Sequence, residues 1–129
     1  YDYMRELHGS LHQRKMITEI NEPFQPALVI LDGIDAFVDG GPMTGKRAKG
    51  EVFLASQDRV AMDAVGVAIL KFLGSNESIM KPKIFEQEQI ARAVELALGA
   101  SSPSEIDVAS ADEKNQIYRD QVLQMLKKG

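Results

Sequence analysis

The sequence of 129 residues contains no cysteine. This absence excludes disulfide bonds, thiolate catalysis and any cysteine-ligated iron–sulfur cluster within the segment. No apolar run approaches the roughly 20 residues that span a bilayer, and the first residues carry no signal-peptide pattern. We therefore expect a cytoplasmic protein with no membrane partner.

An excess of basic residues is also missing. The 15 Lys and Arg are outnumbered by 19 Asp and Glu, which gives a formal net charge of -4. Nucleic-acid binding needs clustered basic side chains that neutralise phosphates, so we expect no nucleic-acid partner. The hydrophobic content of 44% is enough for one folded domain of this length. Small molecules, metals and proteins are the partners that the composition favours.

The stretch GGPMTGKR, residues 40–47, has the glycine and lysine spacing of a phosphate-binding P-loop, GxxxxGK[ST]. Arg47 replaces the hydroxyl residue that would bind magnesium. The residues that follow, 52–55, are β-branched and aromatic and predict a strand, whereas a P-loop opens a helix. The context therefore argues against nucleotide hydrolysis.

The same stretch could hold an anion without being a P-loop, because a glycine turn can offer several N–H donors to one oxyanion. The alternative is a solvated hairpin tip. We expect residues 40–50 to form an exposed connection between two strands, with no helix beginning at Lys46. The candidate cofactor-binding residues are Gly40, Gly41, Pro42, Gly45 and Lys46.

The hydrophobic pattern predicts an α/β fold in which helices pack on the faces of a small mixed or parallel sheet. The apolar run of residues 26–33 is typical of a strand buried on both faces, and residues 34–38 could extend it after a bend. Further predicted strands are residues 52–55 and a short edge strand at 106–108. Helices are predicted for residues 4–20 with a break near Gly9, 59–73, 84–98 capped by Gly99, and 112–128.

Three stretches together resemble one protein family. They are LVILDGIDAFVDGGPMTG (residues 28–45), ASQDRVAMDAVG (residues 55–66) and ALGASSPSEID (residues 97–107). Their order and spacing are similar to the family called domain of unknown function 362, over roughly residues 8–108. One departure is Ala97, which replaces the first glycine of the family's "GLG".

The resemblance implies that residues 1–129 form one α/β domain at the C-terminal part of a longer protein. The missing N-terminal part of that protein would then supply strands and part of a site. The resemblance also implies an association with a ferredoxin-type iron–sulfur partner and with redox metabolism. A cluster would lie outside this segment.

Acidic residues supply the candidate catalytic and metal-binding positions. Asp32, Asp35 and Asp39 follow or end the predicted buried strand, at the edge where open α/β sheets bind ligands; the alternative is that Asp32 caps a turn and the other two are solvated. Asp58 precedes a predicted helix and is favoured there by the helix dipole. Asp63 lies inside that helix among Ala, Met, Val and Gly, where a carboxylate is costly unless it is paired or bound to a cation.

The two histidines complete the candidate metal ligands, which are His8, His12, Asp58 and Asp63. His8 and His12 are spaced i, i+4 and would share a helical face, as two ligands of a divalent metal can. Gly9 stands where the zincin motif HExxH has its general base, which argues against metalloprotease chemistry.

We expect a ligand- or cation-binding half-site, with Asp32 and Asp63 as the candidate catalytic residues and the reaction class open. The alternative is a noncatalytic scaffold that docks an electron-transfer partner. A half-site predicts that Asp32 and Asp63 converge on one concave pocket, and a scaffold predicts that they point apart.

Overall fold

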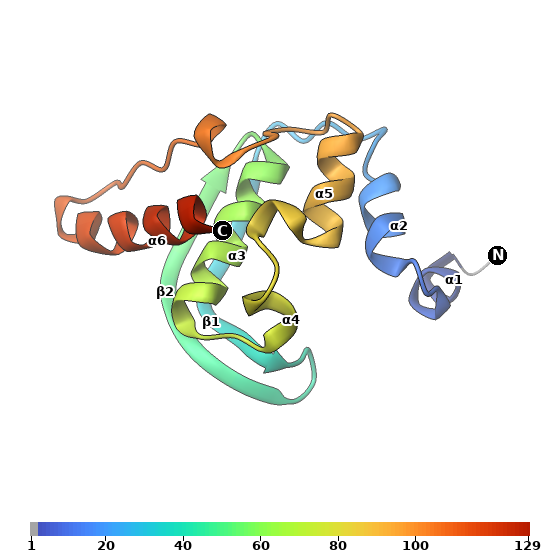
Figure 1. Ribbon diagram of the computed structural model, residues 1–129, viewed down its shortest axis with the longest axis horizontal. Helices are drawn as coiled ribbons and strands as arrows, with labels where there is room; N and C mark the ends of the chain where they lie inside the picture. The colour runs from blue at the N-terminus through green and yellow to red at the C-terminus, as the bar shows by residue number, and fades with distance from the viewer. Residues whose placement is uncertain (1–2) are drawn as a thin grey trace.

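A computed structural model describes residues 3–129 as a β-hairpin covered by helices on one face (Figure 1). The α-helices are α1 (Tyr3–Gly9), α2 (Gln13–Glu19), α3 (Arg59–Leu73), α4 (Glu77–Met80), α5 (Glu88–Glu95) and α6 (Gln116–Lys128). The strands are β1 (Val29–Gly40) and β2 (Gly45–Ser56), and the short 3-10 helices are η1 (Ile84–Glu86), η2 (Pro103–Glu105) and η3 (Glu113–Asn115). The predicted small α/β fold is confirmed.

The sheet of the described residues has two strands, which run antiparallel. The prediction of a mixed or parallel sheet is therefore wrong. The physical reason is the connection, because β2 begins at Gly45 directly after the turn of residues 41–44, and parallel strands need a crossover of about a dozen residues or more. Residues 46–50, predicted as loop, belong to β2, while the expected connection between two strands without a helix at Lys46 is confirmed.

Helix α3 crosses the inner face of the hairpin and forms the centre of the core (Figure 1). Its small residues allow a close approach to the sheet: a side chain at Gly66 would touch Leu31, and Ala64 and Ala68 are fully buried. Helices α5 and α6 pack against α3 from the other sides and contribute Ile90, Val122 and Leu126 to the same cluster. The core thus lies between the sheet and the helices.

The outer face of the hairpin is exposed. Ile30 is 66% exposed and Phe53 is 63% exposed, so the prediction of a strand buried on both faces is wrong. Apolar composition alone cannot distinguish a covered face from an uncovered one, and the described helices lie on the opposite side. No helix in residues 3–129 is both long enough and apolar enough to cross a membrane.

Several predicted helix ends are confirmed, and one is not. The break near Gly9 separates α1 from α2, and α3 ends at Gly74, which has the left-handed conformation (φ 77°) that favours glycine. The predicted helix of residues 84–98 is instead η1 followed by α5, which ends at Glu95, so Gly99 does not cap it. Residues 106–108 lie beside β2 without joining the sheet, so the predicted edge strand is wrong.

Candidate functional site

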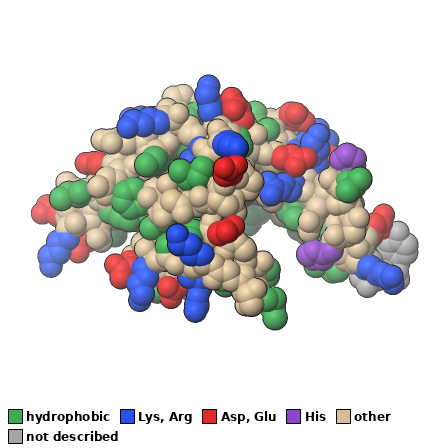
Figure 2. Space-filling model, turned by 60° about the horizontal axis from the view of Figure 1, so that its bottom comes forward, with side chains coloured by type: hydrophobic (Ala, Val, Ile, Leu, Met, Phe, Trp, Pro, Cys, Tyr) green, Lys and Arg blue, Asp and Glu red, His purple; other side chains and the backbone are tan. Residues whose placement is uncertain are grey.

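A concave site lies between the hairpin and the helices, and we call it the β1 cavity. It has a volume of about 540 Å³ and is bounded by β1, α3, the start of α5 and one residue of α2. Its charged lining residues are Arg14, Asp32, Asp35, Asp63 and Glu88. Figure 2 shows the hollow between the helical lobe that carries the histidines and the rest of the molecule. Small-molecule sites have volumes of this order.

The charge of the residues that line the β1 cavity is negative, since they include four acidic residues and one arginine. The rest of the lining is largely apolar and includes Leu31, Phe37, Val67 and Leu70. Within an apolar, partly enclosed site the carboxylates interact more strongly with a ligand charge than they would on an open surface. The cavity therefore favours a cationic ligand with an apolar part.

Asp63 is the carboxylate that α3 directs toward this cavity. The residue is exposed and also lines a smaller cavity of about 220 Å³ between α2, α3 and α5. Arg59, one turn earlier, is engaged elsewhere, because its guanidinium donates to the carbonyl oxygens of Asn21 at 2.6 Å and Phe24 at 2.7 Å. In the described part of the chain no hydrogen bond or ion pair neutralises Asp63. The walls of the two cavities displace water and raise the pKa of the Asp63 carboxyl above its ordinary value.

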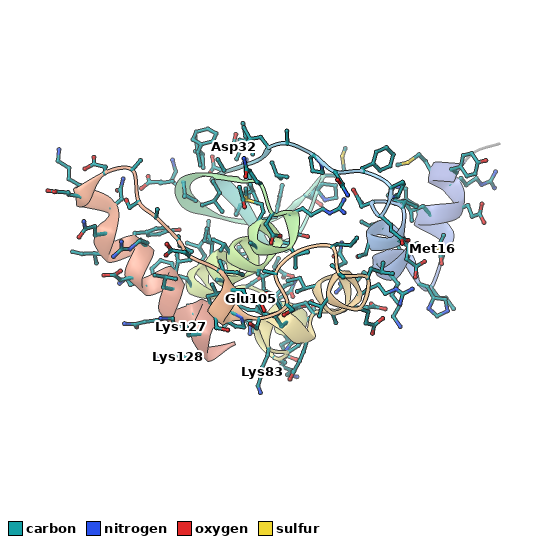
Figure 3. The ribbon with its side chains drawn as sticks, turned by 90° about the horizontal axis from the view of Figure 1, so that it is seen from above. Met16, Asp32, Lys83, Glu105, Lys127 and Lys128 are labelled. Atoms are coloured by element: carbon teal, nitrogen blue, oxygen red, sulfur yellow. The ribbon has the colours of Figure 1, made fainter. Side chains whose placement is uncertain are left out.

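Asp32 also lines the β1 cavity, but its carboxylate is occupied by its own backbone. Oδ1 of Asp32 accepts the N–H of Ile34 at 3.0 Å, as in an Asx turn. Asp32 lies within β1 rather than at its end, on the opposite side of the molecule from Lys83 (Figure 3). Asp32 stands opposite Phe53 in the register, so strand alternation directs its side chain to the outer face with Ile30, and Asp63 is the carboxylate of the cavity that is free to bind.

Asp58 is the N-cap of α3. Its Oδ1 accepts the N–H groups of Val60 at 2.8 Å and Ala61 at 2.9 Å, and its Oδ2 accepts the N–H of Ala100 at 2.7 Å. A side chain at position 99 would collide with this carboxylate, which explains the glycine at Gly99. Both oxygens are thus used to hold the fold.

The histidines do not share a helical face, because the chain break between α1 and α2 falls between them. His8 is in the last turn of α1, where its Nδ1 lies 3.0 Å from Nε2 of Gln13, and His12 is the N-cap of α2. Figure 2 shows them as two separate patches. In residues 3–129, no group of three or more His, Asp or Glu side chains could hold a metal ion. The candidate metal ligands are therefore not brought together.

The candidate cofactor-binding residues of the glycine stretch form the tip of the hairpin. Gly40 ends β1, Gly41 and Pro42 lie in the turn, and Gly45 and Lys46 begin β2. The Gly41 N–H is donated to Thr44 O at 2.6 Å, which closes the turn on itself. Neighbouring Met43 is 89% exposed. These residues lie outside the lining of the β1 cavity, and their role in anion binding stays a prediction.

Sequence reasoning missed four polar residues of the cavity, which are Arg14 and the segment Gln87, Glu88 and Gln89. Arg14 belongs to α2, and the other three lie where η1 passes into α5, so only the tertiary fold brings them to β1. Residues 87–89 are far from β1 in the sequence, so no local pattern predicts that they lie close to it. The one available signal was the polar Gln-Glu-Gln segment at residues 87–89, preceding an amphipathic helix.

Comparisons with known proteins support a family assignment and no finer function. The family model described as domain of unknown function (DUF362) matches residues 2–68, which are just over half of the chain and include two of the three similar stretches. The third, residues 97–107, lies outside that match. No curated protein and no solved structure matches the chain. The match extends from the first helices through the hairpin and most of α3, and on this basis the chain belongs to the domain of unknown function 362 family.

Proposed function

We propose that the β1 cavity is a ligand-binding half-site in which Asp63 binds a cationic group of the ligand. The observation that carries this proposal is that Asp63, which has no hydrogen bond or ion pair to the described residues, lies with Asp35 and Glu88 in the lining of one concave cavity. An unpaired carboxylate that has lost part of its hydration to cavity walls binds a cation more strongly than a fully solvated one does. The apolar lining would hold the rest of the ligand.

The test is chemical-shift mapping on the ¹⁵N-labelled protein with two matched probes, n-butylguanidinium and its neutral isostere n-butylurea. The cation should shift the amides that line the β1 cavity, and the urea should not. Asp63→Asn should weaken cation binding by about fivefold, the size expected for one partly exposed charge pair. Asp107→Asn removes an exposed carboxylate outside the cavity and should change nothing.

Equal shifts with both probes, or equal binding by the parent and Asp63→Asn, would refute the proposal. Magnesium chloride serves as a third probe for the divalent-metal hypothesis. Because no candidate ligand group gathers around a metal position in the described residues, we expect magnesium to give weaker shifts than the organic cation.

The link to iron–sulfur and redox metabolism is a further part of the proposal and rests on the family resemblance alone. The chain has no cysteine, and its two histidines lie apart, so these residues do not fit a cluster. A cluster would be bound by a segment outside residues 1–129 or by a ferredoxin-type partner. Iron and sulfide analysis of the full-length protein, with its visible absorption spectrum, tests this point.

A second candidate function, the noncatalytic interaction domain, is favoured by the outer face of the hairpin. Leu28, Ile30 and Phe53 are all more than half exposed there. Exposed apolar patches of adjoining residues mark protein interfaces more often than single exposed apolar residues do. The two functions use different faces of the sheet and are separable by mutation.

A further inference from the structure

Strand β1 has a free edge over the β1 cavity. β1 has 12 residues, and within residues 3–129 it pairs with β2 alone. The outer edge of β2 is flanked by residues 106–111 and by α6, which line the cavities beside it. The outer edge of β1 has the β1 cavity beside it instead. The two edges of the hairpin are therefore not equivalent.

In the second half of β1, hydrogen bonds from nearby residues already occupy backbone groups at the edge. The N–H of Ile34 is donated to Asp32, and the carbonyl oxygen of Val38 accepts from Ser75 Oγ at 2.7 Å and from the Asn76 N–H at 3.0 Å. Residues 28–33, which are Leu28 and the start of β1, have no such hydrogen bonds at this edge from the described residues. An edge strand whose backbone groups are unpaired is a template for another strand.

The charges beside this edge specify the chemistry of the strand that fits. Asp35, Asp63 and Glu88 line the cavity next to it, with Arg14 as the single opposing charge. A second copy of this chain is a poor occupant, because its β1 would bring three more aspartates, at positions 32, 35 and 39, to an edge that is already acidic. A strand carrying Lys or Arg has the complementary charge.

We propose that residues 28–33, which are Leu28 and the start of β1, accept a third strand from a partner polypeptide whose alternate residues are basic and apolar. The basic side chains point into the β1 cavity and reach Asp63 and Glu88. The apolar side chains point to the other face and extend the exposed surface of Ile30 and Phe53, because successive side chains of a strand alternate between the faces of a sheet. This inference rests on the proposed function in that it uses the same cavity, and it names the partner that closes it.

The test is amide hydrogen exchange on the ¹⁵N-labelled protein with the blocked peptide VKVKVKV. Strand pairing should slow exchange about tenfold or more at those amides of residues 28–33 that point to the free edge, since paired amides exchange only when the pairing opens. The matched acidic peptide VEVEVEV should leave exchange unchanged. Asp63→Asn should weaken VKVKVKV binding about fivefold, and Asp107→Asn should leave it unaltered.

Binding of VKVKVKV without slower exchange at residues 28–33 would overturn strand addition. Equal effects of the basic and acidic peptides, or no effect of Asp63→Asn, would overturn the assigned chemistry. If n-butylguanidinium binds while VKVKVKV protects nothing, this inference fails and the proposed function stands. If VKVKVKV protects β1 while n-butylguanidinium does not bind, the small-ligand function fails and strand addition stands.

Discussion

Two aspartates of α3, one at its N-cap and one inside it, show that the position of a residue decides its role. Asp58 and Asp63 are five residues apart, yet the first accepts three backbone N–H groups and the second has no protein partner in the described residues. The capping role follows from sequence, because Asp before an apolar helical pattern is a favoured N-cap. The Ala100 contact of Asp58 does not, since 42 residues separate the two.

We predict that Asp63→Asn is as stable as the parent protein or more stable at neutral pH. The folded-state pKa of Asp63 is raised above its value in the unfolded chain, so the native state holds the proton more tightly. Stability is then full below the unfolded-state pKa and falls as pH rises through the folded-state pKa. Asn removes that loss and has a similar helix propensity.

Thermal melts of the parent and Asp63→Asn across the acid to neutral range check this pH dependence. The charged groups lining the two cavities beside Asp63, which are Arg14, Arg59, Asp32, Asp35 and Glu88, stay the same in both proteins. The difference in melting temperature should vanish at acidic pH and appear toward neutrality. A variant that melts lower than the parent at neutral pH would show that Asp63 has a structural role and would remove the site hypothesis.

For Asp58 we predict a graded loss of stability. Asp58→Ala removes the cap of α3 and the bond to Ala100, and should cost about 2–3 kcal/mol of unfolding free energy. Asp58→Asn keeps an oxygen for the cap but loses the acceptor for Ala100, so it should cost less. Chemical denaturation measures both values, and hydrogen exchange at Ala100 should quicken in both variants. Equal stability of all three proteins would contradict the described contacts.

At the scale of elements, two glycines explain why the sequence predicts strands that are shorter than those of the hairpin. Gly45 and Gly50 interrupt the apolar alternation and so read as loop, yet both lie in β2, with Gly45 opposite Gly40 in the register. At Gly50 a side chain would collide with the backbone of Gly33, so close strand packing requires the glycine there. Glycine therefore marks close packing at this position, which composition alone cannot distinguish from a turn.

Lys71 shows a connection between elements that the sequence pattern did not reveal. It lies on α3 with 8% of its surface exposed, and its Nζ donates to Met80 O at 3.2 Å, Pro82 O at 2.6 Å and Gly129 O at 2.5 Å. Burial lowers the pKa of Lys71, and the nearby Glu86 charge opposes that shift. One ammonium group thus joins α3 to the last residue of α4, to the segment after it and to the residue that follows α6.

We predict that Lys71→Met destabilises the fold by about 2–3 kcal/mol, because it leaves carbonyl groups without a charged donor. The matched control is Lys81→Met, which removes an exposed lysine that pairs with Glu77 in the same region. That change should cost less than about 0.5 kcal/mol, as exposed ion pairs do. Urea denaturation gives both values, and similar losses for the two variants would contradict the anchoring role of Lys71.

At the scale of the molecule, the sequence predicted the class of fold, but not which surfaces are covered. The apolar run of β1 has the composition of a strand buried on both faces, and α3 covers only one. Whether a strand face is covered depends on elements that are distant in the sequence. The local pattern of β1 therefore could not show that its outer face is exposed. The cavity likewise arises from α2, β1, α3 and α5 together.

The exposed outer face leads to a prediction for the molecule as a whole. Ile30 and Phe53 lie on this face, so a dye such as 8-anilinonaphthalene-1-sulfonate should bind the folded protein there and fluoresce. The double variant Ile30→Thr/Phe53→Thr keeps strand propensity and should reduce that fluorescence at least about twofold, with circular dichroism and melting temperature nearly unchanged. The control, Met43→Thr, changes a more exposed apolar residue at the hairpin tip and should leave the fluorescence as it is. Undiminished dye binding in the double variant would show that the outer face is not the exposed apolar surface of the molecule, and the interaction-domain function would then lose its support.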